Sequence, residues 1–134
     1  MIGKFCSQIT RNLVCAGLMA IPMVTLAATS ALADDSFGAI ARSRATGDKG
    51  YAWNYSSRSQ AERKAIGECN KVSDSGDCRA LVWFKNACGS IAESNDGGAG
   101  TGWGSNEALA ERYALESCSG IGRGCEVSRT ICTE

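Results

Sequence analysis

Three segments in the first half of the chain have the hydrophobic patterns of β-strands. Phe37–Ser43 is a short run of small and apolar residues, and Tyr51–Tyr55 alternates aromatic residues with small or polar ones. Cys78–Lys85 contains the most strand-like run of the sequence, Ala-Leu-Val-Trp-Phe. Alternation and enrichment in aromatic and branched residues predict strands, and the Gly, Ser and Asp clusters between the segments predict turns.

One helix is predicted between the second and third of these strands. Ala61, Ala65 and Cys69 recur at every fourth position, so they share one face of a helix. Ser59, followed three residues later by Glu62, has the pattern of a capping box at the helix start. Because the apolar face consists of small residues, we expect the helix to lie close against a sheet.

The whole pattern occurs a second time, at an offset that decreases from 51 to 47 residues along the chain. The matching pairs are Gly38–Ser43 with Gly89–Ser94, Trp53 with Trp103, Ala61 with Ala110, Ala65 with Ala114, Cys69 with Cys118, and Cys78 with Cys125. The offset changes only across segments rich in Gly, Ser and Asp, where loops absorb deletions. Cys125–Cys132 is thus the counterpart of the third strand.

These patterns predict an α+β fold in which two ββαβ repeats, about residues 36–86 and 87–134, form one disulfide-stapled domain. We expect both helices to pack on one face of a mostly antiparallel sheet, with a pseudo-twofold axis between the repeats. A single repeat is too short to bury enough surface to fold alone.

Residues 1–33 have the features of a secretory signal peptide. Lys4 and Arg11 precede an uncharged stretch of 22 residues, which ends in the small-x-small cleavage sequence Ala31-Leu32-Ala33. An uncleaved membrane anchor is the alternative, since that stretch is long enough to span a bilayer, but acidic residues follow it where an anchor requires basic ones. We expect cleavage near Ala33, a mature domain of residues 34–134 in the periplasm or outside the cell, and no membrane attachment after cleavage.

Composition and charge exclude several classes of function. The 14 basic and 14 acidic residues balance, which removes the usual electrostatic argument for nucleic acid or an anionic membrane as a partner. The absence of histidine excludes Ser–His and Cys–His nucleophile pairs and most catalytic zinc sites. We therefore expect no metal, no cofactor and no nucleic-acid partner.

Six of the eight cysteines lie in residues 34–134, where Leu, Ile, Val and Phe together number only 13. So thin a core needs covalent support, and an even number of cysteines in an exported chain indicates disulfides. Many connectivities are open to six cysteines, but the repeat favours pairing the two that bracket the loop after each helix. The expected pairs are Cys69–Cys78, Cys118–Cys125 and, for the remaining two, Cys88–Cys132.

The segments Phe37-Gly-Ala-Ile-Ala and Asn86-Ala-Cys88-Gly89-Ser-Ile-Ala92, together with this cysteine spacing, resemble the bacterial domain-of-unknown-function family 4189. The resemblance covers about residues 36–132. It implies a small secreted or envelope protein of a bacterium, and it supplies no catalytic residues.

Redox and phosphate-binding chemistry are not indicated. A thioredoxin-like site needs Cys-x-x-Cys at a helix N-terminus, whereas Cys69 and Cys118 are placed at the ends of the predicted helices. The glycine-rich segment 97–104 lacks the Lys-Ser/Thr of a phosphate loop. We expect this segment to be a hairpin connection.

Carboxylates are the remaining catalytic candidates. Glu62 and Glu111 occupy equivalent places in the repeats, and a pseudo-twofold axis that brought them together would resemble a glycosidase pair. Both, however, lie in the first turn of a helix, where the helix dipole favours an acid in any case. A small hydrolase acting on envelope glycans is therefore only the alternative, and we expect no enzyme.

Aromatic residues and loops supply the candidate binding surface. Tyr51, Trp53 and Tyr55 are expected to project from one face of a strand, with Trp53 and Trp103 in the core because the repeat preserves them. Tyr51 and Tyr55 are replaced in the second repeat by Thr and Ser, so the shared fold does not require them. The predicted surface comprises Tyr51, Tyr55, Asn95, Asp96 and Thr101. We expect a binding or interaction module for an unknown protein or glycan partner.

Overall fold

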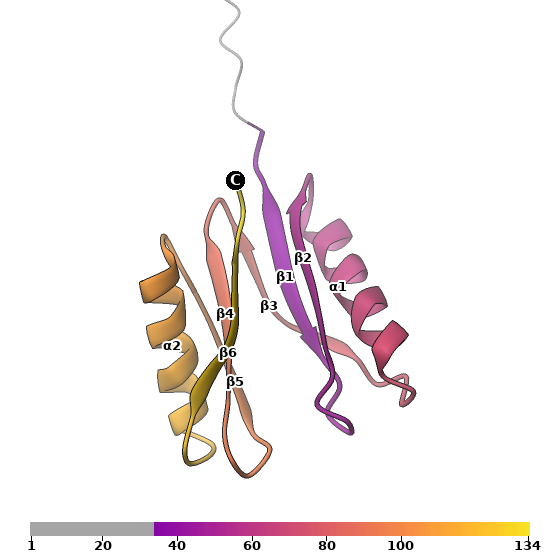
Figure 1. The fold of residues 1–134 in the computed structure, drawn as a ribbon. Coiled ribbons are helices and arrows are strands. Elements are labelled where there is room, and N and C mark those ends of the chain that lie inside the picture. Colours follow the sequence, from indigo (N-terminus) through magenta and orange to yellow (C-terminus); the bar gives the residue numbers. More distant parts are fainter. Residues whose placement is uncertain (1–33) are drawn as a thin grey trace, which may run out of the picture. The chain divides into compact units, whose positions relative to one another are not determined.

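The computed structural model describes residues 34–134, and the predicted signal peptide lies outside these residues (Figure 1). The elements in order are β1 (Phe37–Arg42), β2 (Lys49–Tyr55), α1 (Arg58–Val72), β3 (Arg79–Lys85), β4 (Cys88–Glu93), β5 (Ala99–Gly104), α2 (Glu107–Ser119) and β6 (Glu126–Cys132). The α+β class and the two ββαβ repeats are confirmed. The glycine-rich segment 97–104, expected to be a connection, instead contains the whole of strand β5.

The strands form two three-stranded antiparallel sheets, in the orders β2-β1-β3 and β5-β4-β6. The expectation of one sheet shared by both repeats is therefore wrong. Each repeat completes its own sheet because its third strand returns beside its first. Each sheet is covered by its own helix on one face and by the other sheet on the other, so the helices lie on the two outer sides (Figure 1).

The fully buried side chains between each helix and its sheet are small. The buried residues between α1 and its sheet are alanines and cysteines, and those between α2 and its sheet are Ala92, Ala110, Ala114 and Cys118. Glycines allow a still closer approach: a Cβ on Gly100 would lie 2.1 Å from the backbone nitrogen of Cys118, and one on Gly102 would lie 2.4 Å from that of Ala114. The close helix–sheet packing expected from the alanine pattern is thus present.

The layer between the two sheets holds the few large apolar side chains. Ile40, Phe84, Ile91 and Ile131 are buried there in one cluster. The ring of Phe84 occupies the space that side chains at two glycines, one in each central strand, would fill. This side chain therefore joins the two repeats across the middle of the protein.

Three disulfides join Cys69 to Cys78, Cys88 to Cys132, and Cys118 to Cys125. These are the pairs expected from the repeat. Two of them connect the end of a helix to the strand that follows, and Cys88–Cys132 links directly opposed positions of β4 and β6. Each disulfide lies within a single repeat, so the repeats are held together by noncovalent contacts and one peptide connection.

A pair of opposite charges links the repeats at equivalent positions. Arg42 ends β1 and Glu93 ends β4, and the guanidinium Nε lies 3.1 Å from the carboxylate Oε1. Lys49 lies 2.7 Å from the other carboxylate oxygen. Burial alone would raise the pKa of Glu93, but the hydrogen bond from Lys49, with a smaller contribution from Arg42, lowers it. Glu93 is therefore an anion shared by both sheets.

The helices begin at side-chain caps. Ser57, rather than the predicted Ser59, caps α1, and its hydroxyl accepts the backbone N–H of Gln60. Ser57 and Gln60 have the same capping-box spacing as Ser59 and Glu62, and the earlier pair lies where the chain leaves β2. Asn106 caps α2 in the same way. Among the described residues, no helix is long and apolar enough to cross a membrane.

Candidate functional site

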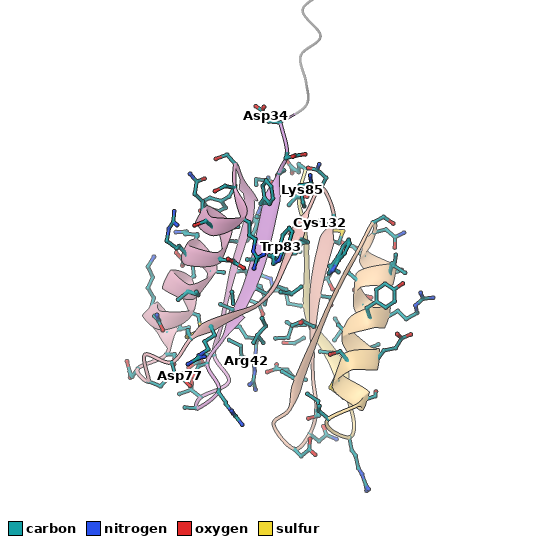
Figure 2. All side chains as sticks on the ribbon, turned by 180° about the vertical axis from the view of Figure 1, so that it is seen from behind. Asp34, Arg42, Asp77, Trp83, Lys85 and Cys132 are labelled. Atoms are coloured by element: carbon teal, nitrogen blue, oxygen red, sulfur yellow. A yellow bond between two sulfur atoms is a disulfide. The ribbon has the colours of Figure 1, made fainter. Side chains whose placement is uncertain are left out.

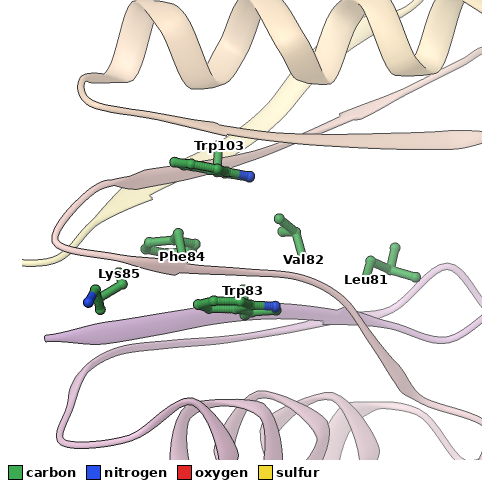
Figure 3. A pocket seen from close by; sticks show the side chains of 6 residues that line it. All are labelled: Leu81, Val82, Trp83, Phe84, Lys85 and Trp103. Carbon is green, nitrogen blue, oxygen red and sulfur yellow. The ribbon is translucent and has the colours of Figure 1, made fainter.

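A groove lies between the edge strand of one sheet and the edge strand of the other. It has a volume of about 420 Å³ and is lined by Leu81, Val82, Trp83, Phe84 and Lys85 of β3 and by Trp103 of β5 (Figure 3). We call it the β3–β5 groove. Leu81, Trp83 and Trp103 are 44, 38 and 58% exposed. Three of the large apolar side chains of a protein with few such residues are thus displayed together.

The alternation of β3 explains how the groove forms. Val82 and Phe84 point toward Trp103 and contribute to the layer between the sheets, whereas Trp83 lies on the other side of the strand (Figure 3). The guanidinium of Arg58, in the first turn of α1, lies 4.6 Å from the centre of the Trp83 ring. One edge strand therefore presents apolar surface on both of its faces.

Trp103 is exposed because its place in the core is already taken. It opposes Gly89 on β4, and the space above that glycine is filled by the ring of Phe84. Its counterpart Trp53 lies on β2, an edge strand of the first repeat's sheet, and is 44% exposed. The prediction that both tryptophans belong to the core is wrong, since the repeat preserves them at positions on edge strands.

The groove continues past Leu81 into a basic section. This second cavity, of about 430 Å³, is lined by Arg42, Arg44, Asp77, Arg79, Leu81 and Ala99. Figure 2 shows this face of the protein, with Lys85 and Trp83 toward one end and Arg42 and Asp77 toward the other. The two cavities share Leu81, so an apolar section and a polar section form one continuous surface.

The charges of the basic section differ in how far they are neutralised. Arg42 is paired with Glu93, whereas Arg44 and Arg79 are exposed and form no ion pair within residues 34–134. Hydrogen bonds from the hydroxyls of Ser43 and Ser75 and from a backbone N–H lower the pKa of Asp77 to about 2. Its carboxylate is thus held by donors from the β1–β2 loop and from its own loop, and two guanidinium groups remain open to a ligand.

Lys85, the cation at the other end of the groove, is already paired with an acidic residue. The Lys85 ammonium lies 3.2 Å from a carboxylate oxygen of Asp35, near the start of the described residues. Hydrogen bonds from Asn86 and Lys85 lower the pKa of Asp35. The cations of the groove without an ion-pair partner within residues 34–134 are therefore Arg44 and Arg79, and the ionised Asp77 lies in the same section.

The tyrosines of the predicted surface do not share a face. Tyr51 is half-buried beside the layer between the sheets, with the Arg129 guanidinium 4.4 Å from its ring centre, and burial raises its pKa. The backbone of Asn54 has a φ of 62°, at an irregularity in the pairing of β1 with β2. Beyond it, Tyr55 packs with Phe37 against the cluster under α1. The prediction that Tyr51 and Tyr55 project from one face is therefore wrong, because the strand does not keep its regular alternation as far as Tyr55.

The remaining members of that surface are spread over the second repeat. Asn95 and Asp96 lie exposed in the loop between β4 and β5, where Asp96 accepts a hydrogen bond from Ser94. Thr101 lies on β5 between Ala99 and Trp103, each of which lines one section of the groove. Of the five predicted residues, only Thr101 is therefore placed beside the groove.

The structure does not bring Glu62 and Glu111 together. They lie on α1 and α2, on opposite outer sides of the paired sheets (Figure 1). Glu62 accepts a hydrogen bond from Arg58, and Glu111 accepts one from the hydroxyl of Thr130. Within residues 34–134 there is also no cluster of three or more metal-ligating side chains.

The apolar part of the groove could not be found from the sequence pattern that predicted β3. The run Ala-Leu-Val-Trp-Phe predicts a buried strand equally well, and the pattern does not show that β3 lies at an edge. The one available signal was the pair of basic residues, Arg79 and Lys85, that flank the run. Charges in a strand are typical of sheet edges.

Comparisons with known proteins concern the family and the fold. The family described as "Domain of unknown function (DUF4189)" matches residues 37–132, which confirms the resemblance seen in the sequence. No curated protein matches the chain. The NMR structure of Rv1813c from Mycobacterium tuberculosis is similar, with a TM-score of 0.54 and 20% sequence identity over 94% of this chain and 99% of that one. At this identity, the similarity shows the fold alone.

Proposed function

The chain belongs to the DUF4189 family, and we propose that it is an exported, disulfide-stabilised binding module whose β3–β5 groove takes up a protein partner. The observation that carries the proposal is the gathering of Leu81, Trp83 and Trp103 around one groove. Single exposed apolar residues are ordinary, whereas a cluster with a polar rim marks an interaction surface.

The composition of the groove is that of a protein interface. Tryptophan and arginine are the residues that most often dominate binding energy at such interfaces, where they occupy central and desolvated positions. The groove offers two tryptophans, with Arg44 and Arg79 in the adjoining section. A volume of 420 Å³ also falls in the range of roughly 300–1,000 Å³ that is usual for ligand pockets.

Export is supported by the covalent chemistry of residues 34–134. All six cysteines in these residues form disulfides, and such bonds persist in oxidising compartments. The apolar core consists largely of alanine, so the disulfides supply stability that burial of large side chains supplies elsewhere. These features support a location in the periplasm or outside the cell.

Binding is favoured over hydrolysis by the separation of the two candidate carboxylates. Glycosidases of both stereochemical classes need two carboxyl groups that flank one bond. Glu62 and Glu111 lie on opposite outer sides of the protein (Figure 1). This supports a module that recognises a partner without turnover.

The proposal is tested by comparing two tryptophan substitutions. Oxidised wild-type protein, Trp103→Ala and Trp53→Ala would be immobilised and exposed to envelope extract and culture supernatant of the producing bacterium. Both tryptophans lie exposed on edge strands. The two variants therefore lose the same side chain, and only Trp103 lines the groove. We expect partners to be retained by Trp53→Ala and lost by Trp103→Ala.

The result that would overturn the proposal is retention of the same partners by wild type and by Trp103→Ala. Loss with Tyr51→Ala/Tyr55→Ala instead would assign binding to the other edge of the protein. Circular dichroism and free-thiol titration would show that each variant is folded and oxidised. Turnover of an envelope glycan that is lost with Glu62→Gln or Glu111→Gln would establish the hydrolase alternative.

A further inference from the structure

We infer that the β3–β5 groove binds an extended acidic peptide segment, which is added as a further strand to the free edge of β3. This inference rests on the proposed function and specifies its partner. Addition of a strand to an exposed sheet edge is a common mode of peptide recognition, in which backbone hydrogen bonds give affinity and side-chain pockets give specificity.

The backbone of β3 is available on one side. In the order β2-β1-β3, β1 pairs with one edge of β3, and the other edge has no strand beside it in the sheet. Within the described part of the chain, no hydrogen bond from outside the sheet reaches the backbone of Arg79–Lys85. An unpaired edge of this length is a template for pairing with another chain.

The regular part of this edge coincides with the apolar section of the groove. Val82–Lys85 pairs residue by residue with β1, and the register shifts only before Val82. A strand added beside Val82–Lys85 would direct alternate side chains to opposite faces of the sheet. One set would meet Trp103 and the other would meet Trp83, because the two indoles lie on opposite sides of β3 (Figure 3).

Charge selects an acidic occupant over a second copy of the protein. If β3 paired with itself in antiparallel register about Val82, Arg79 of each copy would oppose Lys85 of the other. Like charges directly opposed across strands are destabilising. A peptide with acidic residues would instead meet Arg44 and Arg79, which form no ion pair within residues 34–134.

The peptide is expected to run antiparallel to β3, because both strand pairs of this sheet are antiparallel and antiparallel pairing is slightly more stable per residue. β3 runs from Arg79 to Lys85, so a strand antiparallel to it ends beside Arg79. Lys85, at the other end, is already paired with Asp35. The expected ligand therefore has alternating apolar residues followed by acidic residues at its C-terminal end.

The test uses a synthetic peptide, acetyl-Thr-Val-Thr-Val-Asp-Asp with a free carboxylate, titrated into ¹⁵N-labelled oxidised protein. The three indole N–H signals report on the three tryptophans, and Trp53 is the internal control because it lies on the other edge strand. We expect the signals of Trp83 and Trp103 and the amides of Val82–Lys85 to shift, and the signal of Trp53 to stay.

Two modified peptides test whether the backbone pairs. In a β-strand, alternate residues direct their N–H groups toward one neighbour. N-methylation of one alternating set of residues should therefore weaken binding at least tenfold, and methylation of the other set should change it less than threefold. Equal effects of the two sets would overturn strand addition.

A matched pair of protein variants tests the role of charge. Arg79→Glu should weaken binding of the acidic peptide at least tenfold, and should favour a peptide that ends in Lys-Lys. Arg63→Glu makes the same change of charge on the exposed surface of α1 and should leave binding within twofold. Equal binding by both variants would overturn the acidic specificity.

The outcomes separate this inference from the proposed function. If partner capture depends on Trp103 but the peptide shifts none of the groove signals, strand addition is refuted and the binding module stands. If a chito-oligosaccharide shifts the groove signals and the peptide does not, the occupant is a glycan and the inference is refuted. If capture does not depend on Trp103, the proposed function itself fails.

Discussion

Replacement of Gly102 by alanine tests the close packing on which the fold depends. A Cβ at this position would lie 2.4 Å from the backbone nitrogen of Ala114 and 2.6 Å from the carbonyl oxygen of Ala110. Both atoms belong to the backbone of α2, so no side-chain rotation can make room. The equivalent residue in the first repeat is Ala52, which is buried under α1. The second helix therefore tolerates less volume at this position than the first.

The size of the effect follows from the distances. The shortest ordinary contact of a Cβ is 3.4 Å, so α2 would have to move by 3.4 − 2.4 = 1.0 Å and would lose packing along its whole alanine face. Added volume in a well-packed interior costs about 1–3 kcal/mol. For a domain of this size, 1 kcal/mol corresponds to about 4–8 °C in Tm, so we expect Gly102→Ala to lower Tm by about 5–20 °C.

The assay is thermal unfolding of the oxidised protein, with Gly67→Ala as the matched control. Gly67 lies within α1, and a Cβ there would have no neighbour within 4 Å. Alanine is the better helix former by about 0.5–1 kcal/mol, so the same chemical change should raise Tm slightly. If Gly102→Ala is as stable as wild type, α2 does not lie within contact distance of the β5 backbone at Gly102.

Three further predictions concern charge and covalent links. Asp77→Asn should be less stable than wild type at pH 7, and the difference should decline as the pH falls from 3.8 through about 2, because the lowered pKa of Asp77 stabilises only the ionised state. Thermal unfolding at a series of pH values checks this, and a difference as large at pH 2 as at pH 7 would contradict it. Glu93→Gln should lower the free energy of unfolding by about 2 kcal/mol, since it leaves the largely buried Arg42 without its anion. Denaturant unfolding measures this, and an unchanged denaturation midpoint would show that water replaces the pair. Joint replacement of Cys88 and Cys132 by serine should cost about 2–4 kcal/mol in the same assay, and a stability equal to that of wild type would remove this disulfide from the list of structural supports.

The local elements were predictable because each has a strong sequence signal. The alanine and cysteine face of each helix, the alternation of Tyr51–Tyr55 and the run in Cys78–Lys85 all lie within helices and strands of the expected type. The arrangement of the sheets was not predictable in this way. Nearly every residue of β1 and β4 is buried, so these strands are covered on both faces, and a run of small apolar residues does not tell whether a helix or a second sheet covers each face.

The candidate site was predicted less well than the fold, for a related reason. Trp53 and Trp103 recur in the repeat, and their recurrence predicts burial. Recurrence shows only that a position is shared, and here the shared position is on an edge strand. Which strand lies at an edge depends on pairing between segments distant in sequence. The edge position of β3 in turn decides whether Leu81 and Trp83 belong to the core or to the surface.

The placement of the disulfides bears on how such a protein can be divided. No disulfide joins residues 34–86 to residues 87–134, so a cut at the connection between β3 and β4 would release two chains, each with its own sheet, helix and covalent supports. Reassociation of two identical halves would bring two arginines, or two glutamates, to the position that Arg42 and Glu93 now share. Only the unlike halves match in charge, so the fragments should recombine as a heterodimer and could serve as a split reporter of proximity in an oxidising compartment.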